Sequence, residues 1–344
     1  MKILLYTDNH FCEKASIINK LGTKYTLRLE NQINSINWAE ELAHKNGCQY
    51  VICAGDFFDK PNLTQQEITA LNDIRWAPFC AHYFLVGNHE SEENDLHYNS
   101  TQALQLDRND HFIISEPRLL EEPGFELAFL PYITESQRKP LKDYFKPLGD
   151  LPRLLVSHND LFGIQMGPVV SKAGFDPKEL GDFCTICING HLHNGQPITK
   201  KVINLGNLTG KDFGEDASKY SHNVAIIDTD TFIVEYVENP FAFNFYKIEI
   251  TSKADLKKLT TLKQNAIVSV QCTRALLNDT RAAILAQTNI LESRVIIKQE
   301  TTVNQDDNTI IDLSVDQYVK FAECCRAKLE NNELLEAELA EILK

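Results

Sequence analysis

Five short groups of polar residues along the chain combine the carboxylate, amide and imidazole side chains that bind transition-metal ions. They are Asp8-Asn9-His10, the Asp56 of GDFFD, Asn88-His89, His158, and His191-Leu192-His193. Oxygen and nitrogen donors without a thiolate suit Mn²⁺, Fe²⁺ or Zn²⁺ better than Ca²⁺. The candidate ligands are too many for one ion and fit two ions that share a carboxylate: Asp8, His10, Asp56, Asn88, His158, His191 and His193. Two ions about 3.5–4 Å apart can clamp a phosphoryl group and activate water for an in-line displacement.

Each group directly follows an apolar run of strand length, and the runs are residues 2–7, 49–55, 81–87, 153–157 and 183–190. Runs without polar alternation are typical of strands that are covered on both faces. Residues 26–46 and 64–75 predict helices, the first ending before Gly47 and the second opening with a Thr64-x-x-Glu67 capping box. Alternating strands and helices predict a layered α/β fold, with sites at the carboxyl ends of its strands. Any one group alone fits an ordinary turn, but five at strand ends predict a binuclear metal site.

The composition is that of a globular chain with an acidic balance. Its 344 residues are 43% hydrophobic and 24% charged, with a formal net charge of −14. That charge argues against a surface that coats nucleic acid, so a polyanionic substrate would need a local patch, bound cations or a basic partner. No apolar run approaches the roughly 20 residues that span a bilayer, and we expect no membrane association and no signal peptide.

The nine cysteines are odd in number, and most lie within apolar strands. We expect reduced thiols packed as small hydrophobic residues, and therefore a cytoplasmic location. The Cys184-x-x-Cys187 pair could also form half of a zinc site, but no second pair has suitable spacing.

In their order, the motifs DNH, GDFFD, GNHE, SH and GHLH resemble those of the calcineurin-like metallophosphoesterase superfamily. Within it, the chain resembles SbcD-type nuclease subunits of double-strand-break repair, especially the shorter bacteriophage members. The resemblance implies a four-layer α-β-β-α sandwich over residues 1–242 and a small α/β cap domain over residues 243–303. Residues 304–344 would then be a linker and C-terminal helices that bind a partner ATPase.

The resemblance also assigns roles to the polar residues. One ion would be held by Asp8, His10 and His193, the other by Asn88, His158 and His191, with Asp56 bridging the two. His89 would stabilise or protonate the departing O3′. Asp59 would orient His89, or is an ordinary turn residue before Pro61. The chain departs from many cellular members at Phe11, where a leucine-glycine pair is usual, and at SHND, where His-x-His is usual. The other histidines match no motif and are expected in the core or on the surface: His44, His82, His97, His111 and His222.

The C-terminal third predicts a second unit and a helical tail. Strands are expected at 245–253, 266–273 and 293–301, with helices at 255–262 and 277–287. The basic residues of this unit could contact DNA or be ordinary solvated charge: Lys253, Lys257, Lys258, Lys263, Arg274 and Arg281. The tail opens with a Ser314-x-x-Gln317 capping box, and its amphipathic helices could bind the coiled coil of an SbcC-like ATPase or pack on their own chain. The family implies a homodimer within a heterotetramer. Helices within about 64–75 and 95–107 could form its interface, or their apolar faces could belong to the core.

The function favoured by the sequence is a Mn²⁺-dependent DNA nuclease, with Mg²⁺ as the other possible ion. It would remove nucleotides from 3′ ends of duplexes and cut single strands, acting with the ATPase in DNA end processing, recombination and repair. The alternative is a phosphatase or small-molecule phosphodiesterase of the same superfamily. Lys60 stands where protein phosphatases carry an arginine, which disfavours that alternative. A non-catalytic scaffold is also disfavoured, because it has no reason to keep every ligand together with His89.

Overall fold

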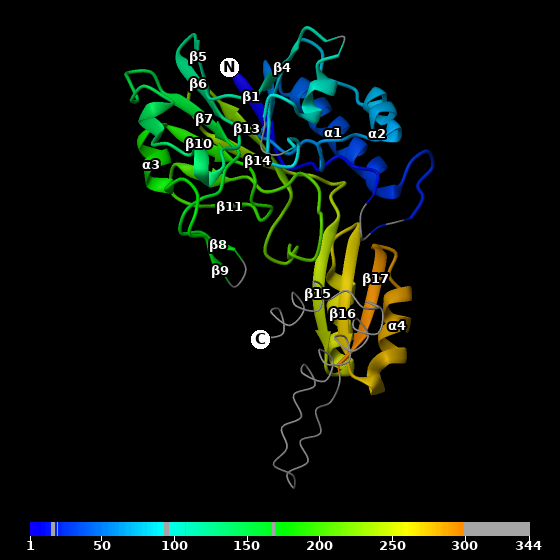
Figure 1. The fold of residues 1–344 in the computed structure, drawn as a ribbon. Coiled ribbons are helices and arrows are strands. Elements are labelled where there is room, and N and C mark those ends of the chain that lie inside the picture. The colour runs from blue at the N-terminus through cyan, green and yellow to red at the C-terminus, as the bar shows by residue number, and fades with distance from the viewer. Residues whose placement is uncertain (15–17, 19, 93–95, 107, 167–168, 299–344) are drawn as a thin grey trace, which may run out of the picture. The chain divides into compact units, whose positions relative to one another are not determined.

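Figure 1 shows the computed structural model, which describes residues 1–14, 18, 20–92, 96–106, 108–166 and 169–298. Residues Met1–Lys298 form one compact unit. Most of it is built from two six-stranded mixed sheets. The predicted tail, 304–344, lies outside the described residues.

The first sheet carries the predicted N-terminal strands side by side. Its order is β14-β13-β1-β2-β3-β4. Strands β1 to β4 run parallel, β13 is antiparallel to β1, and β14 is antiparallel to β13. The strands are β1 Lys2–Tyr6, β2 Tyr50–Cys53, β3 Ala81–Leu85, β4 His111–Ile114, β13 Asn223–Asp228 and β14 Val234–Glu238. The carboxyl ends of β1, β2 and β3 therefore meet at one edge of the sheet.

The second sheet has the order β11-β12-β10-β7-β6-β5, with β6, β7, β10 and β12 parallel. Its strands are β5 Arg118–Glu122, β6 Phe125–Leu130, β7 Arg153–Ser157, β10 Ile186–Asn189, β11 Gln196–Pro197 and β12 Val202–Asn204. The two remaining strands of this region, β8 Gln165–Met166 and β9 Val169–Val170, pair only with each other. Of the apolar runs that precede the polar groups, all five form strands, as predicted.

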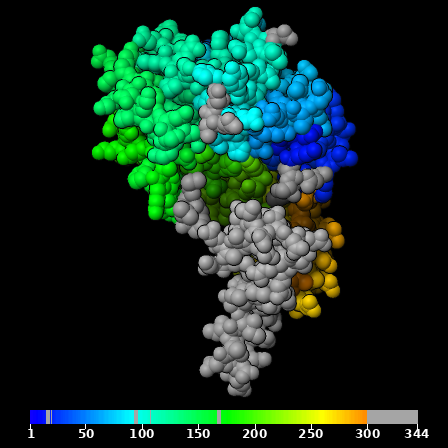
Figure 2. Space-filling model, viewed as in Figure 1, coloured from blue at the N-terminus to red at the C-terminus, as the bar shows by residue number. Residues whose placement is uncertain are grey.

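Side chains that alternate along the strands define four layers. Ile3 and Leu5 of β1 pack between the two sheets, in a core shared with Ile188 of β10. Leu4 and Tyr6 point to the other face, which α1 (Leu27–Lys45) covers. The outer face of the second sheet packs against α3 (Pro177–Asp182). This α-β-β-α order confirms the predicted sandwich, and Figure 2 shows its blue-to-cyan and green halves lying side by side.

The predicted helix boundaries are close to the observed ones. Thr26 caps α1 by accepting from Leu29 N, and Gly47 follows the helix with a φ of 64°. The Thr64–Glu67 capping box is present at the start of α2 (Gln65–Ala70), which continues as the 3-10 turn η1 (Leu71–Asp73). The other 3-10 turns of the sandwich are η2 Ser100–Leu104, η3 Glu135–Gln137 and η4 Leu141–Asp143. The helix expected within 95–107 is thus the 3-10 turn η2.

The expected small α/β unit is present after the sandwich. Its parallel sheet contains β15 Asn244–Ile250, β16 Ala266–Cys272 and β17 Ile290–Ile297. The turns η5 Lys253–Thr261 and η6 Arg274–Leu276 and the helix α4 Leu277–Leu285 connect these strands. The first expected helix, 255–262, is thus a 3-10 segment. The domain boundary between residues 242 and 243 stays a prediction.

Among the described cysteines, all are buried and none forms a disulfide: Cys12, Cys48, Cys53, Cys80, Cys184, Cys187 and Cys272. They pack as small hydrophobic residues, as expected. Within the described part of the chain, no helix combines the length and the apolar character needed to cross a membrane.

Candidate metal centre

The candidate ligands come from strand ends in both sheets. Asp8 and His10 follow β1, Asp56 follows β2 and Asn88 follows β3, whereas His158 follows β7 and the last two histidines follow β10. Backbone bonds join the loops: Asp8 N donates to Gly55 O at 3.0 Å, and His10 N donates to Asp56 O at 3.0 Å. The sequence separation of these residues is therefore bridged by the register of neighbouring strands.

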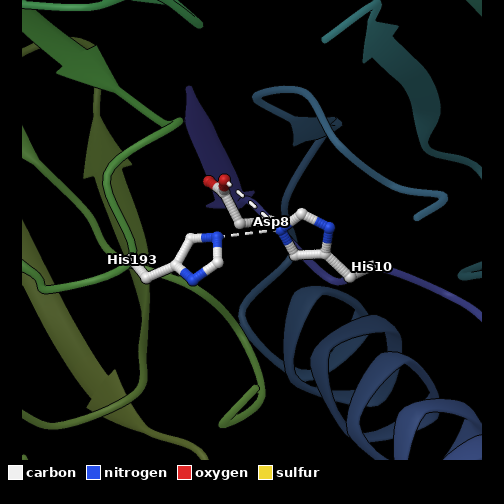
Figure 3. Close-up of side chains that lie close together, drawn as sticks. All are labelled: Asp8, His10 and His193. Atoms are coloured by element: carbon white, nitrogen blue, oxygen red, sulfur yellow. Dashed lines mark hydrogen bonds and ion pairs between the residues drawn. The ribbon is translucent and has the colours of Figure 1, made fainter. Parts of the chain in front are cut away.

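The first cluster consists of Asp8, His10 and His193, each of which offers a donor atom within 4.8 Å of the others. His10 Nε2 lies 3.0 Å from His193 Nε2 and 3.9 Å from Asp8 Oδ1 (Figure 3). Two imidazole nitrogens and a carboxylate oxygen that converge in this way are typical ligands of a divalent transition-metal ion.

The second cluster consists of Asp56, His158 and His191, with donor atoms again within 4.8 Å of one another. His158 Nε2 lies 3.3 Å from Asp56 Oδ2, and Asn88 Oδ1 lies 2.9 Å from His191 Nδ1. Asp56 Oδ2 also lies 3.9 Å from His10 Nε2 in the first cluster. Asp56 therefore lies between the clusters, where a bridging carboxylate must be.

Two of the histidines are held by a hydrogen bond at the ring nitrogen that faces away from the cluster. His158 Nδ1 is 2.7 Å from Ala54 O, and His193 Nδ1 is 3.2 Å from Glu215 Oε1. When Nδ1 donates its proton to such an acceptor, Nε2 keeps its lone pair for a metal ion. These acceptors thus fix the ligand-competent tautomer.

Unpaired buried atoms test whether two ions fit. Within the part of the chain that the structure describes, Asp8 Oδ1 and His158 Nε2 are buried and have no hydrogen-bond partner. Buried polar atoms are nearly always paired, because an unpaired one costs about 1–3 kcal/mol. A cation at each cluster would satisfy these atoms, and the donor set suits a divalent ion. The residues present therefore fit a binuclear centre.

The electrostatics of the clusters also favour cations. Burial lowers the pKa of His10 to about 4, although Asp59 partly opposes it, so that this ring is neutral and can act as a ligand. Burial likewise lowers the pKa of His158, but Asp56 and Asp8 outweigh it and raise that pKa to about 10. The same negative potential attracts a metal ion, which displaces the proton on binding.

The backbone is strained at four of the candidate ligands. Asp8, His10, Asp56 and His191 have φ values of 51°, 49°, 50° and 75°, in the left-handed region that residues with a Cβ rarely adopt. Such conformations cost on the order of 1–3 kcal/mol each and cluster at functional sites. The loops are also closely packed, since a Cβ on Gly87 would overlap the Asp56 carboxylate. The loops are thus held in a geometry that serves the ligands rather than the backbone.

The sequence profile of the calcineurin-like phosphoesterase family matches residues 1–195. The chain belongs to this family. It is also 24% identical over 223 residues to the "Putative phosphoesterase 244L" of Invertebrate iridescent virus 6, covering 60% of this chain and 75% of the viral protein.

Two solved structures are similar to parts of this calcineurin-like phosphoesterase. A dimetal phosphatase from Danio rerio has 14% identity and a TM-score of 0.40, over 65% of this chain and 91% of that one. The calcineurin-like phosphoesterase YfkN from Bacillus subtilis has 11% identity and a TM-score of 0.37, over 69% of this chain and 88% of that one. The family assignment makes the chain a metal-dependent hydrolase of phosphoesters.

His89 lies at the rim of the candidate centre, with about a third of its side chain exposed. Its backbone N donates to Asp56 Oδ1 at 3.0 Å, and its Nδ1 lies 3.0 Å from the backbone carbonyl of Asp59. The Asp59 carboxylate is nearer to His10 Nδ1, at 2.9 Å, than to His89 Nδ1, at 3.7 Å. Both catalytic roles stay predictions, and the geometry adds His10 as the closer partner of the Asp59 carboxylate.

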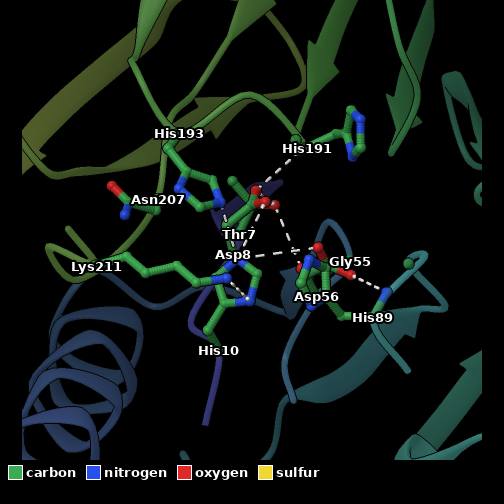
Figure 4. A network of polar contacts seen from close by, with 12 residues as sticks. Thr7, Asp8, His10, Gly55, Asp56, His89, His191, His193, Asn207 and Lys211 are labelled. Carbon is green, nitrogen blue, oxygen red and sulfur yellow. Dashed lines mark hydrogen bonds and ion pairs between the residues drawn. The ribbon is translucent and has the colours of Figure 1, made fainter. Parts of the chain in front are cut away.

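Four polar residues beside the centre of this calcineurin-like phosphoesterase are absent from the predicted set: Asp160, Asn207, Lys211 and Glu215. Lys211 Nζ lies 3.2 Å from His10 Nδ1 (Figure 4). It also lies 2.9 Å from Asp59 Oδ1. Asn207 Nδ2 donates to Glu215 Oε1 at 2.8 Å. Asp160 Oδ1 lies 3.1 Å from His191 Nε2, and its place in SHND was the one signal available in the sequence.

Proposed function

We propose that this calcineurin-like phosphoesterase is a Mn²⁺-dependent DNA nuclease that acts with an SbcC-like ATPase in DNA end processing, recombination and repair. The observation that carries the proposal is the pair of ligand clusters joined at Asp56, with His89 at their rim. Such a site suits hydrolysis of a phosphoester, and the order of the motifs favours DNA phosphodiesters. Both a 3′–5′ exonuclease on duplexes and an endonuclease on single strands are expected.

The residues of the chain divide the chemical work. Divalent ions, when bound to Asp8, His10 and His193 and to Asn88, His158 and His191 around Asp56, supply Lewis-acid charge and lower the pKa of the attacking water. His89, at the exposed rim, donates a proton to the departing O3′. Asp59 holds the His10 ring from behind, and Lys211 balances the charge of the Asp59 carboxylate.

A phosphatase is the alternative within the same family, and the position of Lys60 counts against it. Lys60 Nζ lies 3.0 Å from Glu67 Oε1, a buried carboxylate at the start of α2. The ammonium group is engaged there instead of contacting a candidate ligand. The residue that stands in place of the phosphatase arginine is therefore not positioned to bind a terminal phosphate.

The small α/β unit supplies little free positive charge at several of the expected positions. Lys253 pairs with Asp279 at 3.0 Å and Lys258 pairs with Asp255 at 2.8 Å, while Lys263 pairs with Glu238. These pairs favour ordinary solvated charge over DNA contacts. We therefore propose that the basic surface for DNA comes from the ATPase partner, in a heterotetramer with a homodimer of this chain, and that residues 304–344 bind that partner.

The decisive experiment measures Mn²⁺-dependent release of nucleotides from linear duplex DNA by the full chain, with and without the ATPase. We expect release by the wild type and by the control His44→Ala, which changes an exposed histidine on α1. His89→Ala should lower the rate 10²- to 10⁴-fold, the usual contribution of a positioned general acid. Cleavage of circular single-stranded DNA measures the endonuclease activity in the same reactions.

Two results would overturn the proposal. A wild type that is inert on DNA in both conditions, yet hydrolyses p-nitrophenyl phosphate, establishes the phosphatase. A wild type that binds less than one ion per chain in saturating Mn²⁺ removes the basis of the site itself.

A further inference from the structure

A second group of histidines lies at the other end of the first sheet, on strands β3 and β4. His82 and His111 are direct neighbours in the parallel register of these strands. Both are buried, at 0% and 1% exposure, on the face that α1 covers, and both make edge contacts with the Trp76 ring. His82 lies near the amino end of β3, whereas Asn88 of the candidate metal centre follows the carboxyl end of that strand.

Each ring is held through one nitrogen by an acceptor. His82 Nε2 lies 2.9 Å from Glu40 Oε2, and the same carboxylate oxygen accepts from Ala77 N at 2.9 Å. His111 Nδ1 lies 2.7 Å from Leu104 O. Because a carboxylate and a carbonyl can only accept, both of these ring nitrogens carry the proton. The other nitrogen of each neutral ring then has a lone pair.

Those other nitrogens, His82 Nδ1 and His111 Nε2, are buried and lack a hydrogen-bond partner anywhere in the described ranges. Burial lowers the pKa of His111 to about 4, with a further lowering from His82, so that a proton does not satisfy its lone pair at neutral pH. Glu40 Oε1 is also buried without a partner among the residues that the structure describes. The site thus combines two unused imidazole nitrogens with a buried carboxylate.

Asp110 supplies a third donor from the exposed side. Its backbone oxygen accepts from His82 N at 2.8 Å, which fixes it beside the histidines. His82, Asp110 and His111 each offer a donor atom within 4.8 Å of the other two. Two nitrogens on one zinc ion lie at most about 4.2 Å apart, since each Zn–N bond is about 2.1 Å. A small inward rotation of the side chains therefore closes the site.

We propose that His82, Asp110 and His111 bind a divalent transition-metal ion that fastens the edge strand β4 to β3. Two imidazoles and one carboxylate suit Zn²⁺, Co²⁺ or Ni²⁺ rather than Mg²⁺ or Ca²⁺. Glu40 acts as the carboxylate behind a ligating histidine, in the arrangement that commonly orients such ligands. A water molecule completes the coordination on the exposed side of Asp110. The ion is structural, because the group lies at the amino end of β3 and His89 follows its carboxyl end.

The test uses Zn²⁺ as the probe on the full chain, with crystals grown in zinc and diffraction recorded at the zinc absorption edge. We expect an anomalous peak between His82 and His111, separate from those near Asp8 and His158. In solution, metal analysis after equilibrium dialysis should find one zinc per chain fewer in His111→Gln than in the wild type. Asp110→Asn changes an exposed side chain, and should weaken binding of that ion at least tenfold.

Asp150→Asn is the matched control, because Asp150 is an exposed aspartate in the same sandwich. Asp150→Asn should keep the zinc content of the wild type and its zinc-dependent rise in Tm. Asp110→Asn should lose part of that rise in Tm. Anomalous peaks confined to the centre around Asp8 and His158 would overturn the proposal. So would equal zinc affinity in Asp110→Asn and Asp150→Asn. Neither result depends on cleavage of any phosphoester, so the proposal stands or fails separately from the nuclease.

Discussion

Replacing Glu215 by glutamine tests whether a residue outside the sequence motifs supports the metal centre. Glu215 is buried, and its Oε1 accepts from His193 Nδ1 at 3.2 Å, from Asn207 Nδ2 at 2.8 Å and from Lys211 N at 3.2 Å. Its Oε2 accepts from Lys211 N at 3.0 Å. Glutamine can keep its oxygen at the Oε1 position, so that the contact with His193 survives without its charge. Its NH₂ group then faces the N–H of Lys211, where two donors meet.

The size of the effect follows from these contacts. Hydrogen bonds to a charged group are about twice as strong as neutral ones, at roughly 1.5–3 kcal/mol, so removing the charge and one acceptor costs about 1.5–3 kcal/mol. Part of this cost falls on the orientation of His193 as a ligand. Loss of a carboxylate behind a metal-binding histidine typically weakens metal affinity or activity 10- to 100-fold. We therefore expect the apparent Mn²⁺ affinity of Glu215→Gln to fall 10- to 100-fold.

The assay is hydrolysis of bis-p-nitrophenyl phosphate as a function of Mn²⁺ concentration, with circular dichroism to verify folding. Glu235→Gln, an exposed glutamate on β14, is the control and should match the wild type. If Glu215→Gln titrates with Mn²⁺ as the control does, then Glu215 does not hold His193, and the reasoning is refuted. A loss of activity at saturating Mn²⁺ with unchanged affinity would refute it as well.

Three further predictions concern packing, charge and metal binding. In Gly87→Ala the new Cβ would lie 2.7 Å from Asp56 N and overlap the carboxylate, so Mn²⁺-dependent activity should fall at least 100-fold, whereas Gly149→Ala, in open space, should keep it. Arg153→Met should lower the free energy of unfolding in urea by about 3 kcal/mol, because it leaves Glu126 Oε2, 2.6 Å from the buried guanidinium, without its partner. Removal of metal ions by EDTA should lower the Tm measured by calorimetry. Adding Mn²⁺ at 100 times its Kd should then raise the free energy of unfolding by about 2.7 kcal/mol. An unchanged Tm would contradict the expectation that Mn²⁺ binds the folded chain and not the unfolded chain.

The sequence predicts those ligands that directly follow a continuous apolar segment. Asp8, Asp56 and His158 each follow an apolar run, and neighbouring parallel strands bring the ends of such runs together. The chemistry of the side chains and the period of the strands are both local properties. A layered α/β fold with ligands gathered at its strand ends could therefore be predicted without knowledge of the register, whereas the four-layer sandwich and the assignment of ligands to each ion came from the resemblance to the family.

The residues that the sequence does not reveal are those whose role depends on tertiary contacts. Lys211 and Glu215 lie in a loop that none of the five motifs includes, and only folding brings them to His10 and His193. The choice of partner for the Asp59 carboxylate is similar, because a change of less than 1 Å decides between two histidines. Such distances are set by tertiary packing, so they cannot be predicted from the spacing of residues in a single sequence.

The proximity of His82 and His111 also could not be predicted from the sequence. The two residues are far apart in the chain and become neighbours only through the register of β3 and β4. Each taken alone is an ordinary apolar-strand histidine, and the sequence predicts nothing more than a core or surface position. Their capacity to bind a metal ion becomes apparent only when the acceptors Glu40 and Leu104 are known, because these acceptors determine which ring nitrogens remain unused.

The one-residue spacing of His191 and His193 has a structural reason in the two-cluster arrangement. Leu192 between them is buried in the core on the outer face of the second sheet. The two imidazoles serve different clusters, since His191 is grouped with Asp56 and His158 and His193 with Asp8 and His10. The left-handed φ of 75° at His191 turns the chain between them, and the bond from His191 N to Asp8 Oδ2, at 2.9 Å, ties this turn to the end of β1. The contact with Asp8 therefore offsets backbone strain at His191, and this short segment offers one histidine to each of the two clusters.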